Sequence, residues 1–269
     1  MLGIVLRSLK NNKGSLAIYS IASIGFLEVY VSMFPFMQQQ SAQLSDMLKL
    51  YPESLMKAFG FDSSQLLFDQ IGSFLATEQF SFMWPIMAII FLVSYSNSSI
   101  VGEIENGTVE VLLSQPISRT KIFFGRYFAG LINLFVFTFA SVFAVVPLAL
   151  LHDIKYNTKG LLAFSIEAFL FGAAIFSLAM LASSLFSEKG KANIITIGVL
   201  ISMYVANIVS SLKPSLSDLQ YFSFFHYYNP ASALVKNTFP DWTLIVFIGF
   251  SLVVTAVAAV WFNKRDVAV

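Results

Sequence analysis

The chain has 269 residues, contains no cysteine and is poor in charge. Without cysteine it has no disulfide, no cysteine-ligated zinc or iron–sulfur cluster and no thiol nucleophile. Charged residues make up 12% of the chain and hydrophobic ones 57%, whereas a soluble domain is roughly 25% charged. The formal net charge is +1, and no basic stripe with interleaved aromatics is present, so we expect no nucleic-acid partner. The composition predicts a membrane protein.

Motifs for nucleotide hydrolysis and other catalysis are also missing from the sequence. It has no Gly-x-x-x-x-Gly-Lys-(Ser/Thr) phosphate loop and no Gly-x-Gly-x-x-Gly turn, which are the usual phosphate cradles. It has no His-Glu-x-x-His or Gly-x-Ser-x-Gly either. We therefore expect no enzyme activity, no cofactor and no metal site in this chain.

Long apolar runs are what the sequence has instead. A helix needs about 20 residues to cross the hydrocarbon core of a bilayer. Six runs approach or exceed that length: 16–36, 80–101, 123–151, 161–186, 192–212 and 242–262. The first follows Arg7, Lys10 and Lys13 and is interpreted as a retained helix, not a cleaved signal peptide. The predicted fold is all-α: one polytopic membrane domain over residues 1–269 with six transmembrane helices.

The distribution of Lys and Arg between the predicted loops indicates the orientation, because cytoplasmic loops carry an excess of them. With the N-terminus inside, ten of the 16 basic residues are cytoplasmic and six are outside. We therefore expect both termini and the 102–126 loop to be cytoplasmic.

Two longer segments fall on the outer side in this topology. Apolar residues at helical spacing in 37–79 predict short amphipathic helices that form an outer cap. Residues 213–241, with three prolines, predict a partly irregular lid that dips back toward the membrane. His152 and His226 both lie in outer loops, without an acidic or histidine partner at ligand spacing, and we expect plain surface or interfacial residues.

The 102–126 segment stands out because it places six charged residues in 25 positions between two apolar runs. Thr108 is a plausible N-cap for a short helix over 109–114, which Pro116 would end. Ser118 can cap the next helix, which runs into the third span. The pattern predicts an amphipathic helix at the cytoplasmic surface that is able to transmit force. The alternative is a solvated connector.

The same segment resembles the ABC type-2 exporter permease family, whose members carry Glu-x-x-x-Gly-Thr and then Leu-Leu-Ser-x-Pro-(Val/Ile)-Ser-Arg between the second and third spans. The matching residues here are Glu103, Gly107, Thr108, Leu112, Leu113, Ser114, Pro116, Ile117, Ser118 and Arg119. Gly125-Arg126 stands where the family usually has Gly-Lys. Residues 261–267 resemble the family's closing signature, and residues 51–60 resemble the branch of copper-enzyme-maturation and bacitracin-type permeases.

The resemblance implies the membrane subunit of an ATP-driven exporter in a bacterial or archaeal plasma membrane. Its partners would be separate ATPase subunits, which bind the ATP and Mg, and a second copy of this chain or a paralogue. The residues expected to couple the bundle to the ATPase are Glu103, Glu105, Gly107, Thr108, Glu110, Leu112, Leu113, Ser114, Pro116, Ser118 and Arg119. Because no strongly polar path lines the spans, a hydrophobic or amphiphilic cargo is favoured.

Polar residues inside the predicted spans are costly to insert and usually face protein or water. The candidates for a substrate path or a dimer interface are Glu28, Asn97, Asn133 and Glu167. Hydrogen bonding that fixes helix packing is the alternative for each.

Two other function classes stay open at this point: an ion-driven secondary transporter and a non-transport integral-membrane protein. The first would show paired broken helices in two repeated halves, and the second a catalytic constellation inside the membrane. Copurification with an ATPase whose turnover depends on this chain would separate the exporter from both.

Overall fold

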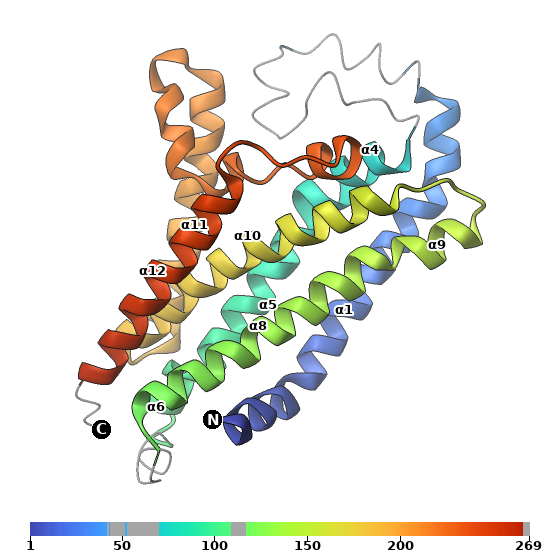
Figure 1. Ribbon diagram of the computed structural model, residues 1–269. Helices are drawn as coiled ribbons and strands as arrows, with labels where there is room; N and C mark the ends of the chain where they lie inside the picture. The colour runs from blue at the N-terminus through green and yellow to red at the C-terminus, as the bar shows by residue number, and fades with distance from the viewer. Residues whose placement is uncertain (42, 44–51, 53–69, 109–116, 266–269) are drawn as a thin grey trace.

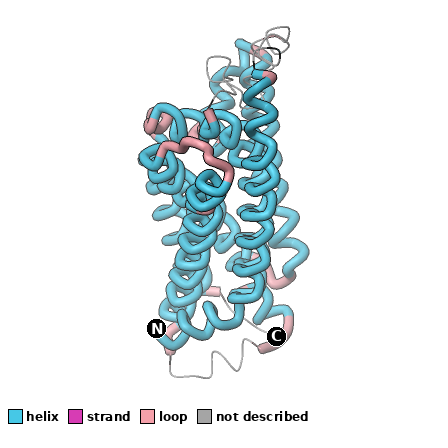
Figure 2. Tube along the Cα trace, turned by 90° about the vertical axis from the view of Figure 1, so that its right-hand side faces the viewer, coloured by secondary structure: helices cyan, strands magenta, loops and turns pink. Residues whose placement is uncertain are grey.

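A computed structural model describes residues 1–41, 43, 52, 70–108 and 117–265. The described residues form helices and loops without a strand (Figure 2), as the predicted all-α class requires. The elements, in chain order, are α1 Leu2–Gln39, α4 Ile71–Leu75, the π-helix η1 Ala76–Met83, α5 Trp84–Ser99, α6 Val101–Glu105, α8 Arg119–Phe143, α9 Val145–Leu151, α10 Thr158–Leu185, α11 Lys189–Leu212, the 3-10 helices η2 Pro214–Phe222 and η3 Phe224–His226, the π-helix η4 Ser232–Lys236, and α12 Thr243–Lys264.

Six helical stretches are long and apolar enough to cross a membrane, one for each predicted run. They are Leu2–Gln39, Ile71–Ser99, Arg119–Leu151, Thr158–Leu185, Lys189–Leu212 and Thr243–Lys264. The first has 38 residues and at 1.5 Å per residue is about 57 Å long, well beyond a hydrocarbon core of roughly 30 Å. The basic stretch before the first apolar run therefore continues the same helix.

The second span begins earlier than the sequence predicts. Residues 71–79 were assigned to the outer cap, but α4 and η1 run directly into α5. Two polar side chains of this stretch donate hydrogen bonds inside the bundle. The Thr77 hydroxyl donates to the carbonyl of Ser73 at 3.1 Å, and the buried Gln79 donates to the carbonyl of Ser23 at 3.4 Å. The predicted amphipathic helices around Leu48 and Met56 lie outside the described residues.

Helix α10 is the centre of the bundle and packs against α5, α8, α11 and α12. In its most apolar 18-residue stretch 72% of the residues are buried, compared with 17% in α11. Stacked aromatic rings fill the interior: Trp84 lies 5.6 Å from Phe137, and Phe171 lies 4.2 Å from Tyr228 between ring centroids. The Trp84 indole N–H donates to the Ser141 hydroxyl at 2.8 Å, which satisfies the polar edge of a buried ring.

The start of α1 and the end of α12 lie at the same end of the bundle (Figure 1). We call this the terminal end, and the opposite end, where α1 ends and α10 begins, the distal end. An even number of spans brings both ends of a chain to the same side of the membrane, so this placement agrees with six spans.

The segment after α11 has the irregular form predicted for it, with 3-10 and π turns between residues 214 and 236, and it packs on the distal end. The Tyr228 hydroxyl donates to the carbonyl of Phe80 at 2.8 Å. A methyl group at Gly160 would lie 2.1 Å from the carbonyl oxygen of Leu234, so the backbones of α10 and η4 are in close contact. We call residues 213–241 the lid.

Candidate functional site

The described part of the predicted coupling segment begins with the short helix α6, which follows α5 at the terminal end. Helix α6 ends at Glu105, and Gly107, two residues later, has a φ of +69° in the left-handed region. The Gly107 amide donates to the carbonyl of Ile104 at 3.1 Å. A left-handed residue that closes a helix is most often glycine, because a Cβ is strained there. The conformation thus explains the glycine of the motif.

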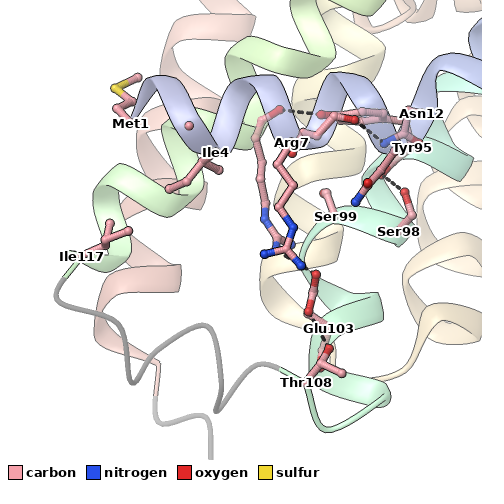
Figure 3. A pocket seen from close by; sticks show the side chains of 14 residues that line it. Met1, Ile4, Arg7, Asn12, Tyr95, Ser98, Ser99, Glu103, Thr108 and Ile117 are labelled. Atoms are coloured by element: carbon pink, nitrogen blue, oxygen red, sulfur yellow. Dashed lines mark hydrogen bonds and ion pairs between the residues drawn. The ribbon is translucent and has the colours of Figure 1, made fainter.

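Glu103 on α6 connects two elements of the site through both carboxylate oxygens. Its Oε1 accepts from a guanidinium N–H of Arg126 on α8 at 3.0 Å, and its Oε2 accepts from the Thr108 hydroxyl (Figure 3). Arg126 is 7% exposed, and a charge that far from water needs a counterion. Glu103 therefore connects α6 to the start of the third span. We call such a side-chain contact between two helices or their ends a tie.

Glu105, two residues further on, makes a tie to the fifth span. Its Oε2 accepts from the backbone N–H of Lys189 at 3.1 Å and lies 3.8 Å from the same residue's Nζ. Lys189 is the first residue of α11, where unpaired N–H groups and the helix dipole favour an anion. Both side chains are more than a third exposed, so the pair is a weak tie.

The third span begins at Ser118, as the sequence predicts. The Ser118 hydroxyl oxygen accepts from the backbone N–H of Lys121 at 3.4 Å, with an extended backbone at the cap. The Arg119 guanidinium, next in the chain, donates to the backbone carbonyl of Arg265 beyond the end of α12. This contact connects the coupling segment to the last span.

Arg265 itself covers the C-terminal end of α10. Its guanidinium donates to the carbonyls of Ser184 at 2.8 Å and Phe186 at 2.9 Å, and to the Ser187 hydroxyl. A cation is favoured there because helix C-termini expose unpaired carbonyls. Burial lowers the pKa of Arg265, and the three acceptors replace the lost water.

The remaining coupling candidates are Glu110, Leu112, Leu113, Ser114 and Pro116, and these lie outside the described residues. The helix predicted over 109–114 therefore stays a prediction. In the described part, the Thr108 hydroxyl donates back to Glu103.

Two of the intramembrane candidates are asparagines. The Asn97 side-chain amide on α5 donates to the Asn193 oxygen on α11, which joins the second and fifth spans. Asn133 on α8 is 1% exposed, and its Nδ2 has no hydrogen-bond partner among the described residues. The structure brings Asn97 near the terminal-end ties and leaves Asn133 inside the bundle.

Glu167 holds the lid against the distal end. It is fully buried on α10, and its Oε1 accepts from the backbone N–H of Asn229 at 2.8 Å. Its Oε2 has no hydrogen-bond partner among the described residues. Burial raises the pKa of the neighbouring Tyr228 hydroxyl, and the Glu167 charge adds to the effect. Among the described residues, this carboxyl accepts one backbone N–H and forms no ion pair.

Glu28 is paired, and the pairing corrects one expectation. Its Oε1 lies 3.0 Å from Nε2 of His152, so the prediction that His152 has no acidic partner is wrong. The two residues are 124 positions apart, and local spacing gave no sign of the contact. His226 stays an interfacial residue: its ring lies against Tyr221 and Tyr227, and burial lowers its pKa.

Residues 7–267 match the model of a protein family described as "ABC-2 family transporter protein". The chain belongs to the ABC-2 transporter family. A search of curated proteins finds no match. For this ABC-2 family protein, membership and six apolar helices are consistent with the membrane subunit of an ABC transporter.

Sequence reasoning missed the partners of the coupling residues in this ABC-2 protein. It named Glu105 without Lys189, and Asn97 without Asn193. A usable signal was present, because in a six-span topology the 102–126 loop and the 186–191 loop lie at the same membrane face. The two loops carry opposite charges, Glu105 on the first and Lys189 on the second, which favours a contact between them, whereas nothing in the sequence indicates the Asn97–Asn193 contact.

Proposed function

We propose that this chain is the membrane subunit of an ATP-driven exporter, worked by a separate ATPase that binds the terminal end from the cytoplasm. ATP and Mg are bound by that partner. The chain contributes the translocation path and the surface on which the partner acts.

The observation that carries the proposal is the convergence of three ties on residues 103–119, a stretch that ends with the first residue of α8. Glu103 links it to α8, Glu105 to α11, and Arg119 to the end of α12. A displacement of this segment would therefore move three spans together. A solvated connector has no need of such ties, so the arrangement favours force transmission.

The positive-inside pattern supports the orientation. The terminal end carries Arg7, Lys10, Lys13, Lys189 and Lys191, and cytoplasmic faces are enriched in such residues. The proposed setting is the plasma membrane of a bacterium or archaeon, with both termini inside.

The poorly covered helix α11 supports pairing with a second permease subunit. Only 17% of its apolar stretch is buried, and Ile194 and Ile201 are 72% and 57% exposed. Gly198, Ser202 and Ala206 share the same face at four-residue spacing, which allows close helix contact in membranes. A path between two copies would be mostly apolar here, which fits a hydrophobic or amphiphilic cargo.

The direct test is transport in vesicles by the purified chain together with its proposed ATPase partner. Glu105→Lys places a second ammonium against Lys189 and removes the anion from the start of α11. We expect ATP-dependent transport to fall about tenfold, equivalent to about 1.4 kcal/mol in the coupled step. The ATPase should still turn over, and the bundle should stay folded.

The matched control for that variant is Glu188→Lys. Glu188 lies at the same end but contacts Lys191 within its own segment, at 2.6 Å, and joins no two spans. It should leave transport within twofold. Equal losses in both variants, or intact transport in Glu105→Lys, would reject the coupling role of the tie.

An ion-driven carrier is the second candidate, and Glu167 is the observation in its favour. Buried intramembrane carboxyls often carry protons or cations in such proteins. Uptake or release driven by an ion gradient in vesicles without any ATPase would establish it. Transport that requires the partner and ATP would exclude it.

A further inference from the structure

A polar cavity opens at the terminal end between the N-terminal part of α1 and the helices α5, α6 and α8 (Figure 3). Its volume is about 580 Å³, within the roughly 300–1,000 Å³ of small-molecule sites. Arg7 and Asn11 line it from α1, Ser98 from α5, Glu103 from α6 and Arg126 from α8. No function discussed above uses its α1 wall.

The cavity holds more positive than negative charge. Both oxygens of Glu103 are already bound, one by Arg126 and one by Thr108. Arg7 makes no hydrogen bond or ion pair with any described residue, although its side chain extends from α1 toward Glu103 (Figure 3). Arg7 and Arg126 are close enough for their charges to repel. One carboxylate thus faces two guanidinium groups.

The donor groups that remain are those suited to an anion with several oxygens. Arg126 uses one recorded N–H of its five-donor guanidinium on Glu103. Arg7 offers all of its donors, and the Asn11 amide makes no recorded bond among the described residues. Planar guanidinium forks bind phosphate in a bidentate manner. An anion between the two would also relieve their repulsion.

The position of the cavity indicates where such a phosphate comes from. The α1 wall exposes Leu2 and Leu6, at 72% and 58%, next to the charged face formed by Arg7 and Lys10. A helix with apolar and basic faces lies in the boundary between headgroups and acyl chains. A lipid phosphate at that depth would lie level with Arg7.

We propose that this cavity binds a phosphate group, supplied by the headgroup of a membrane lipid. The phosphate bridges Arg7 on α1 and Arg126 on α8, and so connects the first helix to the Glu103 tie. The inference goes beyond the proposed transport function, since it needs neither the ATPase nor the cargo.

The test measures lipid binding to the full chain in detergent by native mass spectrometry. Three probes are titrated: short-chain phosphatidylglycerol, the matched diacylglycerol without the phosphate, and inorganic phosphate. We expect phosphatidylglycerol to bind and the diacylglycerol not to. Arg7→Gln should weaken binding about tenfold, the effect of losing one charged hydrogen-bonding partner, and Arg7→Lys should weaken it less.

Lys10→Gln and Lys13→Gln are the controls, because they remove the same charge from the same helix and neither residue lines the cavity. Each should change affinity by less than threefold. Competition by inorganic phosphate, lost in Arg7→Gln, would support the phosphate site and assign it to a soluble ligand. Failure of both phosphate-bearing probes to bind, equal binding of the diacylglycerol, or equal losses at Lys10 and Lys13 would overturn the proposal.

Discussion

At the terminal end, the carboxylates of Glu103 and Glu105 meet cations carried by other helices, whereas at the distal end Glu167 meets a backbone N–H of the lid. The first arrangement depends on opposite charges, because each carboxylate offsets the positive charge of the Arg or Lys side chain near it. The second depends on the presence of an acceptor atom. Replacing a carboxyl by an amide should therefore cost much at the terminal end and little at the distal end.

The difference fits the roles proposed for the two ends. The exposed Glu105–Lys189 tie can open and close at modest cost, which suits a segment that a partner moves. The Glu103–Arg126 tie, in which Arg126 is buried, keeps α6 fixed to α8. A buried hydrogen bond between α10 and the lid is expensive to break, which suits a closed cap. Glu28 and His152, also near the distal end, are partly exposed and are intermediate between the two cases.

The largest effect is expected for Glu103→Gln. The amide leaves Arg126 buried without a counterion, which costs about 3–5 kcal/mol of folding free energy and breaks the tie to α8. ATP-dependent transport should fall more than tenfold, and the thermal unfolding midpoint in detergent should drop. Glu188→Gln, at the same end, should change both by little. A fully active Glu103→Gln would remove the distinction between the two ends.

A smaller effect is expected at Glu167, where two substitutions of the same residue should differ in their cost to folding free energy. Glu167→Gln keeps an oxygen for the Asn229 amide and should cost less than about 1 kcal/mol. Glu167→Ala leaves that amide unsatisfied next to a void and should cost about 2–4 kcal/mol. Thermal unfolding of the purified variants measures both. If the Gln variant is as unstable as the Ala variant, then the negative charge matters at the distal end as well.

The smallest effect is expected at Gly107. Gly107→Ala forces a Cβ into the left-handed region and should cost about 1 kcal/mol. Gly190→Ala is the control, because nothing lies within 4 Å of an added Cβ there and a helical alanine is favoured. The midpoint of thermal unfolding should fall for Gly107→Ala and rise for Gly190→Ala. A stable Gly107→Ala variant would show that the turn after α6 can change shape freely.

The features that local sequence decides were predicted, and those that depend on distant contacts were not. Six spans follow from apolar runs near the thickness of the bilayer, and the Ser118 cap follows from its place before a helical pattern. The start of the second span near Ile71 was missed, because the buried Gln79 donates its side-chain N–H to Ser23, which is 56 residues away. The Glu28–His152 contact was missed for the same reason.

At the candidate site, the sequence predicted several of the residues that make contacts, but it did not predict their partners. Gly107 and Glu103 were named from a family motif, and the structure supplies their physical reasons: a left-handed turn and an ion pair. The cavity beside Arg7 could not be predicted, because it forms only when α1 lies against α5 and α8.

The claim that an ATPase works on the terminal end requires that end to be cytoplasmic. The chain has no cysteine, so single cysteines can be labelled in intact cells with a maleimide that does not cross membranes. We predict that Lys213→Cys, on the lid, is labelled directly and that Asn106→Cys, beside Gly107, is labelled only after permeabilisation. Direct labelling of Asn106→Cys in sealed cells would contradict the account, because no cytoplasmic ATPase could then reach Glu103.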